Sequence, residues 1–433
     1  RNTWLVTANH THIALWGVGY NATIRGSRAT VDVDVAIENP QKGMTLDVRL
    51  PDAEGKVVAK ANTPANAANT LRLNVKNAHL WDINDTYLYS MTTSIVEKGR
   101  IIDQTVTKVG LRSLDFNPNT GFALNGRNMK VKGVCLHHDA GVLGAAVPEA
   151  VWERRLKTLK SMGVNAIRTS HNPQAPIVYD LCDSIGLLVM DEISDEWEFP
   201  KRKWISGWNK GTPGFDGSHD FFEEWIERDV TDMVRRDRNH PCVFLWSIGN
   251  EVDYPNDPYS HPVLDGDSIS QPMYGGYNPQ APRAERIGTI AKRLARCVRA
   301  ADSSRPVTGA LAGVAMSNAT EYPAAVDVVG YNYTESRYAT DHAAYPQRII
   351  FGSENGRQLS SWRAVEENDF IFGEFVWTGI NYLGESRQWP SRGLGSGLLG
   401  FGGLLNPVGE FFKELWCDEP TAYIGTSKPK SKG

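Results

Sequence analysis

Two glutamates each stand near the end of an apolar run that is otherwise typical of a buried strand. Glu251 ends the run VFLWSIGNE (243–251), and Glu354 lies near the end of RIIFGSEN (348–355). When two carboxyl groups face one small volume, one tends to be protonated while the other is ionised, because each disfavours ionisation of the other. One group can then protonate a leaving oxygen while the other attacks a carbon atom, which is the chemistry that hydrolysis of a glycosidic bond requires.

Further polar side chains repeat this placement at the C-terminal ends of apolar runs. Asn250 sets an amide beside Glu251, where it can bond a sugar hydroxyl, and Arg168 can keep Glu354 ionised. The remaining members are His137, His138, Asp139, His171, Asp191, Glu192, Tyr331, Tyr333 and Trp377. A solvated loop or a capping ion pair explains any one of them alone, but not their presence after nearly every run.

Eight apolar runs position these groups, and helical patterns alternate with them. Continuous apolar runs fit strands that are buried on both faces of a parallel sheet. Eight such units fit a (β/α)8 barrel, in which the C-terminal ends of the strands line the active site. The main alternative, a doubly wound sheet, lacks a GxGxxG after an early strand. The runs span residues 129–138, 164–171, 187–193, 243–251, 306–312, 326–333, 348–355 and 370–378.

The first 113 residues follow a different pattern, in which apolar residues occupy every second position of short runs. ATVDVDVAIEN (29–39) is the clearest example, with four branched apolar residues on one face. Several short strands without helices between them predict an antiparallel sandwich. We expect this sandwich over residues 1–115, and a barrel over residues 116–425 that begins with a connector at 116–127. The other alternating runs lie at residues 44–60, 71–77, 86–96 and 104–114.

The overall composition disfavours several classes of partner. The formal net charge is −4 and no long basic stripe is present, which argues against binding to nucleic acid or to an anionic membrane surface. No apolar stretch is long enough to span a bilayer. The five cysteines lack metal-like spacing and are typical of reduced, structural thiols. The compartment stays open between periplasmic, secreted and cytoplasmic, and a homo-oligomer is compatible with these features.

Seven motifs carry a resemblance to a known protein family. The most specific are NAIRTSHNPQ (165–174) and DRNHPCVFLWSIGNE (237–251). The others, in the order and spacing of the family's barrel, are GVCLHHD (133–139), LCDSIGLLVMDE (181–192), DVVGYNY (327–333), GSEN (352–355) and GEFVWTGINYLGE (373–385). The sequence resembles glycoside hydrolase family 2, the group of bacterial β-galactosidases, β-glucuronidases and β-mannosidases. The resemblance covers nearly the whole chain and implies an immunoglobulin-like β-sandwich followed by a (β/α)8 TIM barrel.

The resemblance also implies roles for individual residues. Glu251 corresponds to the acid/base, Glu354 to the nucleophile, and Asn250 to the residue that bonds the sugar 2-hydroxyl, a contact that strengthens in the transition state. The other implied substrate-binding positions are His137, His171, Tyr333 beside the nucleophile, and Trp377 as an apolar platform.

These roles predict a retaining exo-β-glycosidase that acts on oligo- or polysaccharides, with β-galactosidase as the first expectation. The alternatives are a β-glucuronidase or a glycosidase for acidic or sulfated galactose. A non-catalytic carbohydrate-binding protein is the alternative from another class, and the intact pair Glu251 and Glu354 argues against it.

Three departures from the family pattern qualify this prediction. In DEISDEWEFP (191–200), Glu198 stands where metal-binding members have a histidine, so we expect no metal and no other cofactor. Arg357, three residues after the nucleophile, has a planar fork of donors suited to a carboxylate or sulfate of the substrate; alternatively, it pairs with Glu374 or Glu385. No Asn-x-Lys element typical of the glucuronidases occurs between residues 380 and 415.

Two further features concern the surroundings of the site. The jelly-roll sugar-binding domain expected before residue 1 is missing, as in a processed fragment or a cut chain, and residues 1–10 resemble its tail. Long loops at 194–219 and 252–280 are rich in Trp and Tyr. They either form subsites for the rest of the oligosaccharide or pack against another domain or subunit.

Overall fold

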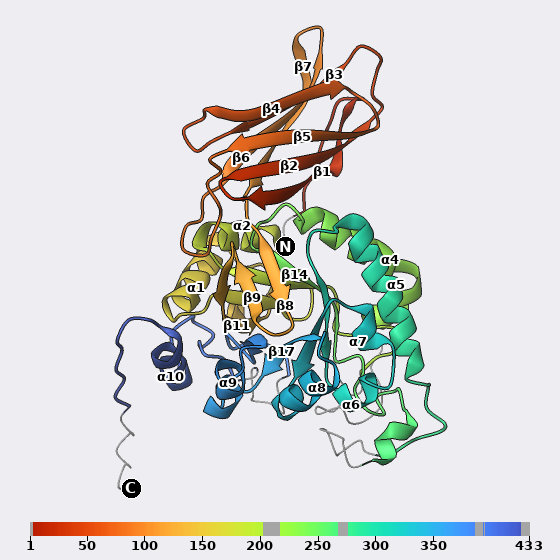
Figure 1. Ribbon diagram of the computed structural model, residues 1–433, viewed down its shortest axis with the longest axis vertical. Coiled ribbons are helices and arrows are strands. Elements are labelled where there is room, and N and C mark those ends of the chain that lie inside the picture. Colours follow the sequence, from red (N-terminus) through yellow and green to blue (C-terminus); the bar gives the residue numbers. More distant parts are fainter. Residues whose placement is uncertain (1–2, 202–216, 267–275, 386–392, 394, 426–433) are drawn as a thin grey trace.

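The computed structural model describes residues 3–201, 217–266, 276–385, 393 and 395–425. A β-sandwich and a closed barrel of eight parallel strands lie one above the other in Figure 1. Both parts confirm the fold predicted from the sequence. Residues 3–10 precede the first strand, and the side chains of Trp4, Leu5 and Val6 are exposed.

The sandwich consists of two antiparallel sheets with the strand orders β1-β2-β5 and β4-β3-β6-β7. Alternate residues of β2 are buried, as the sequence pattern predicts. The pattern does not predict β1, because its pairing with β2 shifts register between Ile13 and Val18 and the alternation is interrupted there. The strands are β1 (His12–Arg25), β2 (Arg28–Glu38), β3 (Thr45–Pro51), β4 (Val57–Pro64), β5 (Ala68–Lys76), β6 (Tyr89–Glu97) and β7 (Arg100–Val109).

The barrel contains all eight strands predicted from the apolar runs. Neighbours in the chain pair in parallel, and β18 closes the barrel against β11. Nearly every residue of these strands is buried, because helices cover the outside and side chains fill the inside. The strands are β11 (Val131–Leu136), β12 (Ala166–Thr169), β13 (Leu188–Glu192), β14 (Val243–Asn250), β15 (Val307–Leu311), β16 (Val328–Asn332), β17 (Ile349–Asn355) and β18 (Ile371–Val376).

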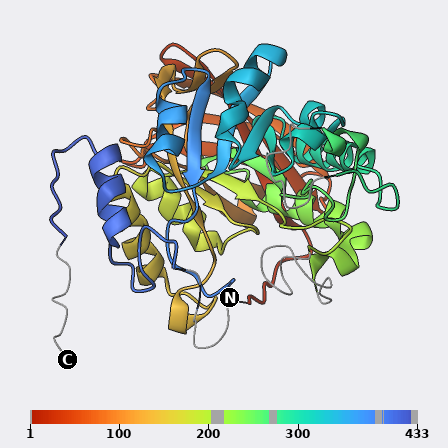
Figure 2. The same ribbon diagram turned by 90° about the horizontal axis from the view of Figure 1, so that it is seen from below.

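Helices surround the barrel, and Figure 2 shows them around the strands from the side away from the sandwich. In the part of the chain that the structure describes, no helix has the length and apolar character needed to cross a membrane. The α-helices are α1 (Glu149–Ser161), α2 (Pro176–Ile185), α4 (Phe222–Asp237), α5 (Glu285–Ala301), α6 (Val314–Ser317), α7 (Tyr322–Ala325), α8 (Tyr338–Ala344), α9 (Leu359–Glu366) and α10 (Pro407–Trp416). The 3-10 helices are η1 (Gly141–Leu143), η2 (Ser218–Phe221), η3 (Pro262–Asp265) and η5 (Glu335–Arg337).

The segment expected to be a simple connector forms a small antiparallel sheet instead. It comprises β8 (Leu114–Asn117), β9 (Gly121–Leu124) and β10 (Arg127–Met129). Phe116 and Phe122 from this sheet pack against Phe244 of β14 and Phe372 of β18, with ring centroids 5.4–6.2 Å apart. The connector thus supplies aromatic side chains to the barrel core. The domain boundary that we propose after residue 115 falls within β8.

The sandwich contacts the barrel near the N-terminal ends of its strands. Arg112 donates hydrogen bonds to the carbonyl oxygen of Pro241 and to that of Val243, the first residue of β14, at 2.5 and 2.7 Å. Trp81 Nε1 donates to the carbonyl oxygen of Asp183 in α2, at 2.8 Å. These contacts lie at the opposite end of β14 from Asn250, so the polar residues after the strands face away from the sandwich (Figure 1).

Candidate active site

The guanidinium of Arg168 is the centre of a hydrogen-bond network at the C-terminal end of the barrel. The side chain projects from β12, is fully buried, and donates to both carboxylate oxygens of Glu192, with a shortest distance of 2.8 Å. Nη1 donates to Glu354 Oε2 at 3.0 Å, and Nη2 donates to Asn250 Oδ1 at 2.8 Å. Burial alone lowers the pKa of Arg168, but the carboxylates outweigh burial and hold this pKa above its ordinary value. Glu354 therefore contacts a permanent positive charge.

Glu354 receives a second donor on its other carboxylate oxygen. The Tyr333 hydroxyl donates to Glu354 Oε1 at 2.8 Å, and the Tyr333 backbone N–H donates to the Glu354 carbonyl at 2.7 Å. Tyr333 has φ 51°, a left-handed conformation that is uncommon outside glycine. Tyr333 as a whole residue is 44% exposed, but burial of its hydroxyl beside Glu354 and Glu251 holds its pKa well above the ordinary value. Tyr333 therefore keeps its proton and remains a donor.

Glu251 begins the turn after β14, and its environment accounts for the Gly-Asn-Glu sequence there. Glu251 is 7% exposed and has φ 46°. Trp197 packs behind the strand and donates from Nε1 to the carbonyl oxygen of Ile248 at 2.9 Å. A Cβ atom at Gly249 would lie 2.7 Å from that ring nitrogen, so only glycine fits without a shift of the ring. The apolar part of the run fills the barrel wall, and its last two residues reach the network.

Asn332, the last residue of β16, connects the two carboxylates. Its Nδ2 atom lies 3.2 Å from Glu251 Oε1 and 3.5 Å from Glu354 Oε2. These two oxygens therefore lie within about 6.7 Å of each other, which is compatible with the ~5–5.5 Å spacing of retaining glycosidases. The sequence analysis missed Asn332, although its position at a strand end, between Tyr331 and Tyr333, was a usable signal. The Tyr331 hydroxyl instead donates to Asp341, away from the carboxylates.

His171 and Asn250 extend the network beyond Arg168. His171 Nδ1 lies 2.6 Å from Glu192 Oε1, and its Nε2 lies 3.4 Å from Asn250 Nδ2 and 4.0 Å from Glu354 Oε2. Burial raises the pKa of Glu192, but Arg168 and His171 outweigh burial and lower it, so Glu192 is ionised. The sequence placed Glu192 at a strand end without giving it a site role. In the structure it holds both Arg168 and His171.

An aromatic wall adjoins these polar groups. The indole of Trp377 stacks on the imidazole of His171, with centroids 5.3 Å apart and planes 6° from parallel. His137 stacks in the same way on Tyr382, at 3.6 Å and 4°. Burial, together with the nearby His171, lowers the pKa of His137 well below its ordinary value, so this imidazole is neutral. The sequence analysis missed Tyr382, which follows Trp377 in the same motif.

Arg357 is the predicted site residue that no contact links to this network. Arg357 is half-buried and, within the described ranges, makes no hydrogen bond or ion pair. The expected pairing with Glu374 or Glu385 is wrong, because Asn355 donates to Glu374 and the Tyr382 hydroxyl donates to Glu385. The amide of Asn355 and the hydroxyl of Tyr382 are thus the hydrogen-bond donors to the two acidic side chains that were the alternative partners of Arg357.

Glu374 and Asn355 form a buried polar pair behind the strand that carries Glu354. Asn355 Nδ2 donates to Glu374 Oε2 at 2.8 Å. Glu374 Oε1 and Asn355 Oδ1 are both buried acceptors without a hydrogen-bond partner among the residues that the structure describes. Burial raises the pKa of Glu374 to about 8. The neutral carboxyl group of Glu374 carries a proton, so it can act as a hydrogen-bond donor as well as an acceptor.

The acidic stretch after β13 is held by protein partners. Glu196 Oε1 lies 3.0 Å from His219 Nδ1, and Glu198 accepts from Arg286 at 2.7 Å and from the Tyr259 hydroxyl at 2.5 Å. These partners do not fit a metal site built on Glu196 and Glu198, because a cationic guanidinium is bound to the carboxylate of Glu198. The absence of a required metal stays a prediction from the sequence.

The aromatic residues expected to form subsites in the two long loops are mostly buried. Trp197, Tyr254 and Tyr259 are between 2% and 8% exposed, so they pack within the protein and do not offer a face to a sugar. Tyr277 is 37% exposed. Trp204, Trp208 and Tyr274 lie outside the described residues.

A second group of potential metal ligands occurs at the other end of the barrel. Asp183, His240 and Cys242 have ligand atoms within 4.8 Å of one another. His240 Nδ1 lies 2.6 Å from Asp183 Oδ2, and the Cys242 backbone N–H donates to Asp183 Oδ1 at 2.9 Å. Burial lowers the pKa of His240, but Asp183 outweighs burial and raises it to about 9. The cluster is therefore an ion pair that fixes the start of β14.

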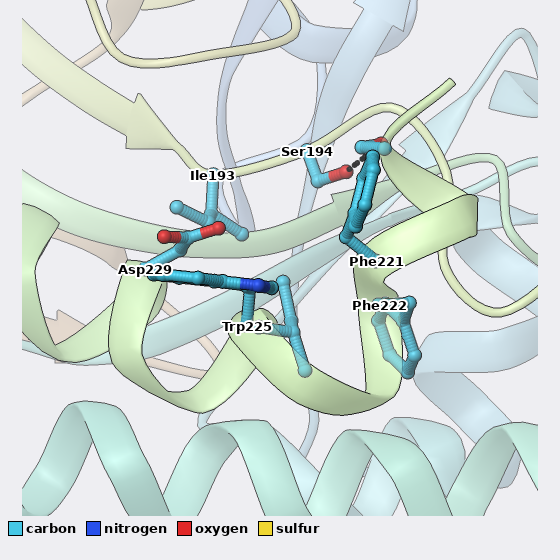
Figure 3. A pocket seen from close by; sticks show the side chains of 8 residues that line it. Ile193, Ser194, Phe221, Phe222, Trp225 and Asp229 are labelled. Carbon is cyan, nitrogen blue, oxygen red and sulfur yellow. Dashed lines mark hydrogen bonds between the residues drawn. The ribbon is translucent and has the colours of Figure 1, made fainter. Parts of the chain in front are cut away.

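A largely apolar pocket lies apart from the carboxylates. It has a volume of about 450 Å³. Figure 3 shows Phe221, Phe222 and Trp225 from η2 and α4 facing Ile193 and Ser194 across it. None of its lining residues bonds Glu251 or Glu354 in the part of the chain that the structure describes. Hydrolytic chemistry needs the carboxylates, so we place the candidate active site at the network around Arg168.

Two family models match the two parts of the chain. The model described as "Glycosyl hydrolases family 2, TIM barrel domain" matches residues 118–391, and the model described as "Glycosyl hydrolases family 2" matches residues 11–112. Both matches agree with the division into a barrel and a preceding sandwich.

Individual relatives are similar over most of this chain. Beta-galactosidase BoGH2A of Bacteroides ovatus is 31% identical, over 98% of this chain and 56% of that protein. A Beta-glucuronidase of Bacteroides fragilis is 25% identical, over 92% of this chain and 59% of that protein. A crystal structure of a glycosyl hydrolase family 2 member from Bacteroides cellulosilyticus has a TM-score of 0.78 at 29% identity, over 95% of this chain and 51% of that one. The chain spans little more than half the length of these relatives.

We predict that Glu374→Gln removes a pH dependence of stability. Burial raises the pKa of Glu374 to about 8, so the folded protein keeps a proton that the unfolded chain releases near 4.5. The stability contributed at this site is therefore present at low pH and is lost between these two values, at roughly 1.4 kcal/mol per pH unit. Gln does not titrate, so the free energy of unfolding of the variant should rise relative to the native protein as the pH increases.

Urea unfolding at about pH 5 and about pH 8 measures this difference. The control is Glu366→Gln, at an exposed position of α9, which should show no such rise. Equal pH dependence in the native protein and Glu374→Gln would contradict the prediction.

Proposed function

The chain belongs to glycoside hydrolase family 2, and from this premise we propose that it is a retaining exo-β-glycosidase that removes terminal β-linked galactose from oligo- or polysaccharides. One observation carries the proposal: Glu251 and Glu354, from two different strands, share one amide nitrogen at the mouth of the barrel. Two carboxyl groups at this spacing support a double displacement.

Glu354 is the proposed nucleophile. The Arg168 guanidinium on one of its oxygens and the Tyr333 hydroxyl on the other both favour the ionised form. The carboxylate attacks the anomeric carbon, the bond to the leaving oxygen breaks, and a covalent glycosyl ester forms.

Glu251 is the proposed acid/base. It gives its proton to the leaving oxygen in the first step, and in the second it takes a proton from the water that attacks the glycosyl ester. Its carboxyl group is nearly inaccessible to water, and the charge of Glu354 nearby favours the protonated form that the first step needs.

The remaining groups bind the sugar. The Asn250 amide, held by Arg168, is the proposed partner of the 2-hydroxyl, and the neutral imidazole of His137 and the ring of His171 are proposed partners of other hydroxyls. Trp377 offers an apolar face to the sugar ring. No step is assigned to a metal, because Arg286 and Tyr259 bind Glu198 where a metal-binding member would have a histidine.

Galactose is the first choice of sugar, and an acidic or sulfated galactose is the second. Relatives named as a β-galactosidase and as a β-glucuronidase are both similar to this chain, so similarity alone does not separate them. The Arg357 side chain, without an ion-pair partner in the described part of the chain, favours the second choice. Turnover of a panel of nitrophenyl β-glycosides tests the proposal, and no turnover of any member would favour a carbohydrate-binding protein.

We predict that Glu354 forms the covalent intermediate. A 2-deoxy-2-fluoro β-galactoside slows both steps and should trap the ester, because the fluorine destabilises the oxocarbenium-like transition state. Mass spectrometry of the peptides should locate the label on Glu354. A label on another residue would show that the nucleophile is assigned wrongly.

We predict that Glu251→Ala loses most activity on substrates with poor leaving groups and far less on those with good ones, which need little protonation. Added azide should react with the glycosyl ester, because the variant lacks the base that activates water. The expected product is a β-glycosyl azide, identified by NMR. An α-configured product would contradict retention.

We predict that Arg357→Ala discriminates between neutral and anionic substrates. A charged hydrogen bond to a sulfate or carboxylate contributes roughly 1.5–3 kcal/mol. Its loss should lower kcat/KM for a 6-sulfated galactoside by about tenfold to a hundredfold, with little change for the neutral galactoside. Arg363→Ala, at an exposed position of α9, is the control. Equal losses on both substrates would leave the plain β-galactosidase as the proposal.

A further inference from the structure

The amide of Asn332 occupies a position between the two carboxylates that no step above has used. Its Nδ2 atom lies 3.0 Å from Asn250 Oδ1, 3.2 Å from Glu251 Oε1 and 3.5 Å from Glu354 Oε2. We infer that Asn332 is a positioning residue whose N–H group donates to Glu251 or to Glu354 in turn, following the negative charge as it passes between them. This inference rests on the proposed function of the two glutamates.

The orientation of the amide follows from its neighbours. Asn332 Oδ1 accepts a hydrogen bond from the Ser353 hydroxyl at 2.6 Å, while Nδ2 faces three oxygen atoms. Turned by 180°, the amide would direct its carbonyl oxygen at the ionised carboxylate of Glu354 and at the amide oxygen of Asn250, neither of which can donate. The N–H groups therefore point at the carboxylates.

The number of hydrogens explains why this donor can alternate. Nδ2 has two hydrogens and three acceptors within reach. The closest acceptor, Asn250 Oδ1, takes one hydrogen, and the oxygens of Glu251 and Glu354 compete for the other. A hydrogen bond to an ionised oxygen is roughly twice as strong as one to a neutral group, so the second hydrogen goes to whichever carboxyl carries the charge.

The charge changes place during the proposed reaction. Before the first step Glu354 is ionised and Glu251 is protonated; after it, Glu354 is an ester and Glu251 is a carboxylate. Of these two carboxyl groups, Arg168 contacts only that of Glu354, so it cannot follow this change. A second cation between the carboxylates would favour ionisation of both and remove the acid. A neutral amide supports one negative charge without deciding which oxygen carries it.

The fold holds Asn332 in this position. It is fully buried at the end of β16, where it pairs in register with Glu354 of β17. The preceding Tyr331 points the other way, to Asp341 and Arg348, as alternation along a strand requires. The following Tyr333 turns the chain with a positive φ. Among the described residues, the charged and titratable groups that contact the amide or its hydrogen-bond partners include Glu251, Glu354, Arg168, Glu192, His171, Asp195, Lys201 and Tyr333.

The pH dependence of kcat/KM tests this inference, because it reports the free enzyme. Asn332→Ala should lower kcat about tenfold to a hundredfold on an activated nitrophenyl galactoside. Each carboxylate loses a donor that favours its ionised form, so both limbs of the profile should move to higher pH, by roughly 0.5–1 unit. Asn332→Asp keeps the shape of the side chain and replaces the donor by an acceptor. If the alanine variant does not fold, Asn332→Asp serves in its place, and it should show the same decrease in kcat and the same direction of shift of both limbs.

Asn318→Ala is the matched control. Asn318 also uses its amide on both sides, to Asp341 and Arg348, near the same strand, but it reaches neither carboxylate. The control should lower stability and leave both limbs in place. Limbs that stay in place in Asn332→Ala or Asn332→Asp, or that move equally in Asn318→Ala, would overturn the inference.

The native enzyme separates this failure from that of the proposed function. If the native protein is labelled at Glu354 by the fluoro sugar and has a bell-shaped profile, unmoved limbs in the Asn332 variants count against Asn332 alone. If the native protein is labelled elsewhere, the proposed function fails first and the inference fails with it.

Discussion

A guanidinium without access to water, held against two carboxylates, is the constraint on which the mouth of the barrel depends. Arg168 is fully buried and binds Glu192 and Glu354 together. A buried charge needs its partners, and removing one of them typically costs about 3–5 kcal/mol. Glu354, a proposed catalytic group, therefore also contributes to the stability of the folded barrel.

The charges around Arg168 influence the protonation of the neighbouring side chains. One guanidinium faces both Glu192 and Glu354, and the imidazole of His171 also lies 2.6 Å from Glu192. Other groups in contact with these carboxylates include the neutral amide of Asn332 and the hydroxyl of Tyr333. Because Glu251 and Glu354 lie close together, each disfavours ionisation of the other, which favours one shared proton on the pair; a glycosidase of the retaining type requires this state.

The ends of the strands set the direction in which these side chains point. Backbone turns directly after the strands adjust that direction. Glu251 and Tyr333 both adopt a positive φ directly after their strands. Such conformations cost of order 1–3 kcal/mol and persist where the surroundings fix them. Here the Glu251 N–H binds the carbonyl of Ala310 on β15, and the Tyr333 N–H binds that of Glu354 on β17. The neighbouring strands thus hold the turns, while the sandwich contacts the opposite end of the barrel.

The sequence by itself determined the eight strands, because continuous apolar runs have few alternatives to a buried sheet, and it determined which polar residues follow them. Arg168, Asn250, Glu251 and Glu354 could be named on that basis. Only the tertiary structure decided which of these groups are in contact. Asn332 lies between the carboxylates, and Glu192 binds Arg168. Tyr382 stacks on His137, and the partner of Glu374 is Asn355 instead of Arg357. These contacts join strands far apart in the chain, and a local pattern gives the strand on which a side chain lies, not the partner that packing brings to it.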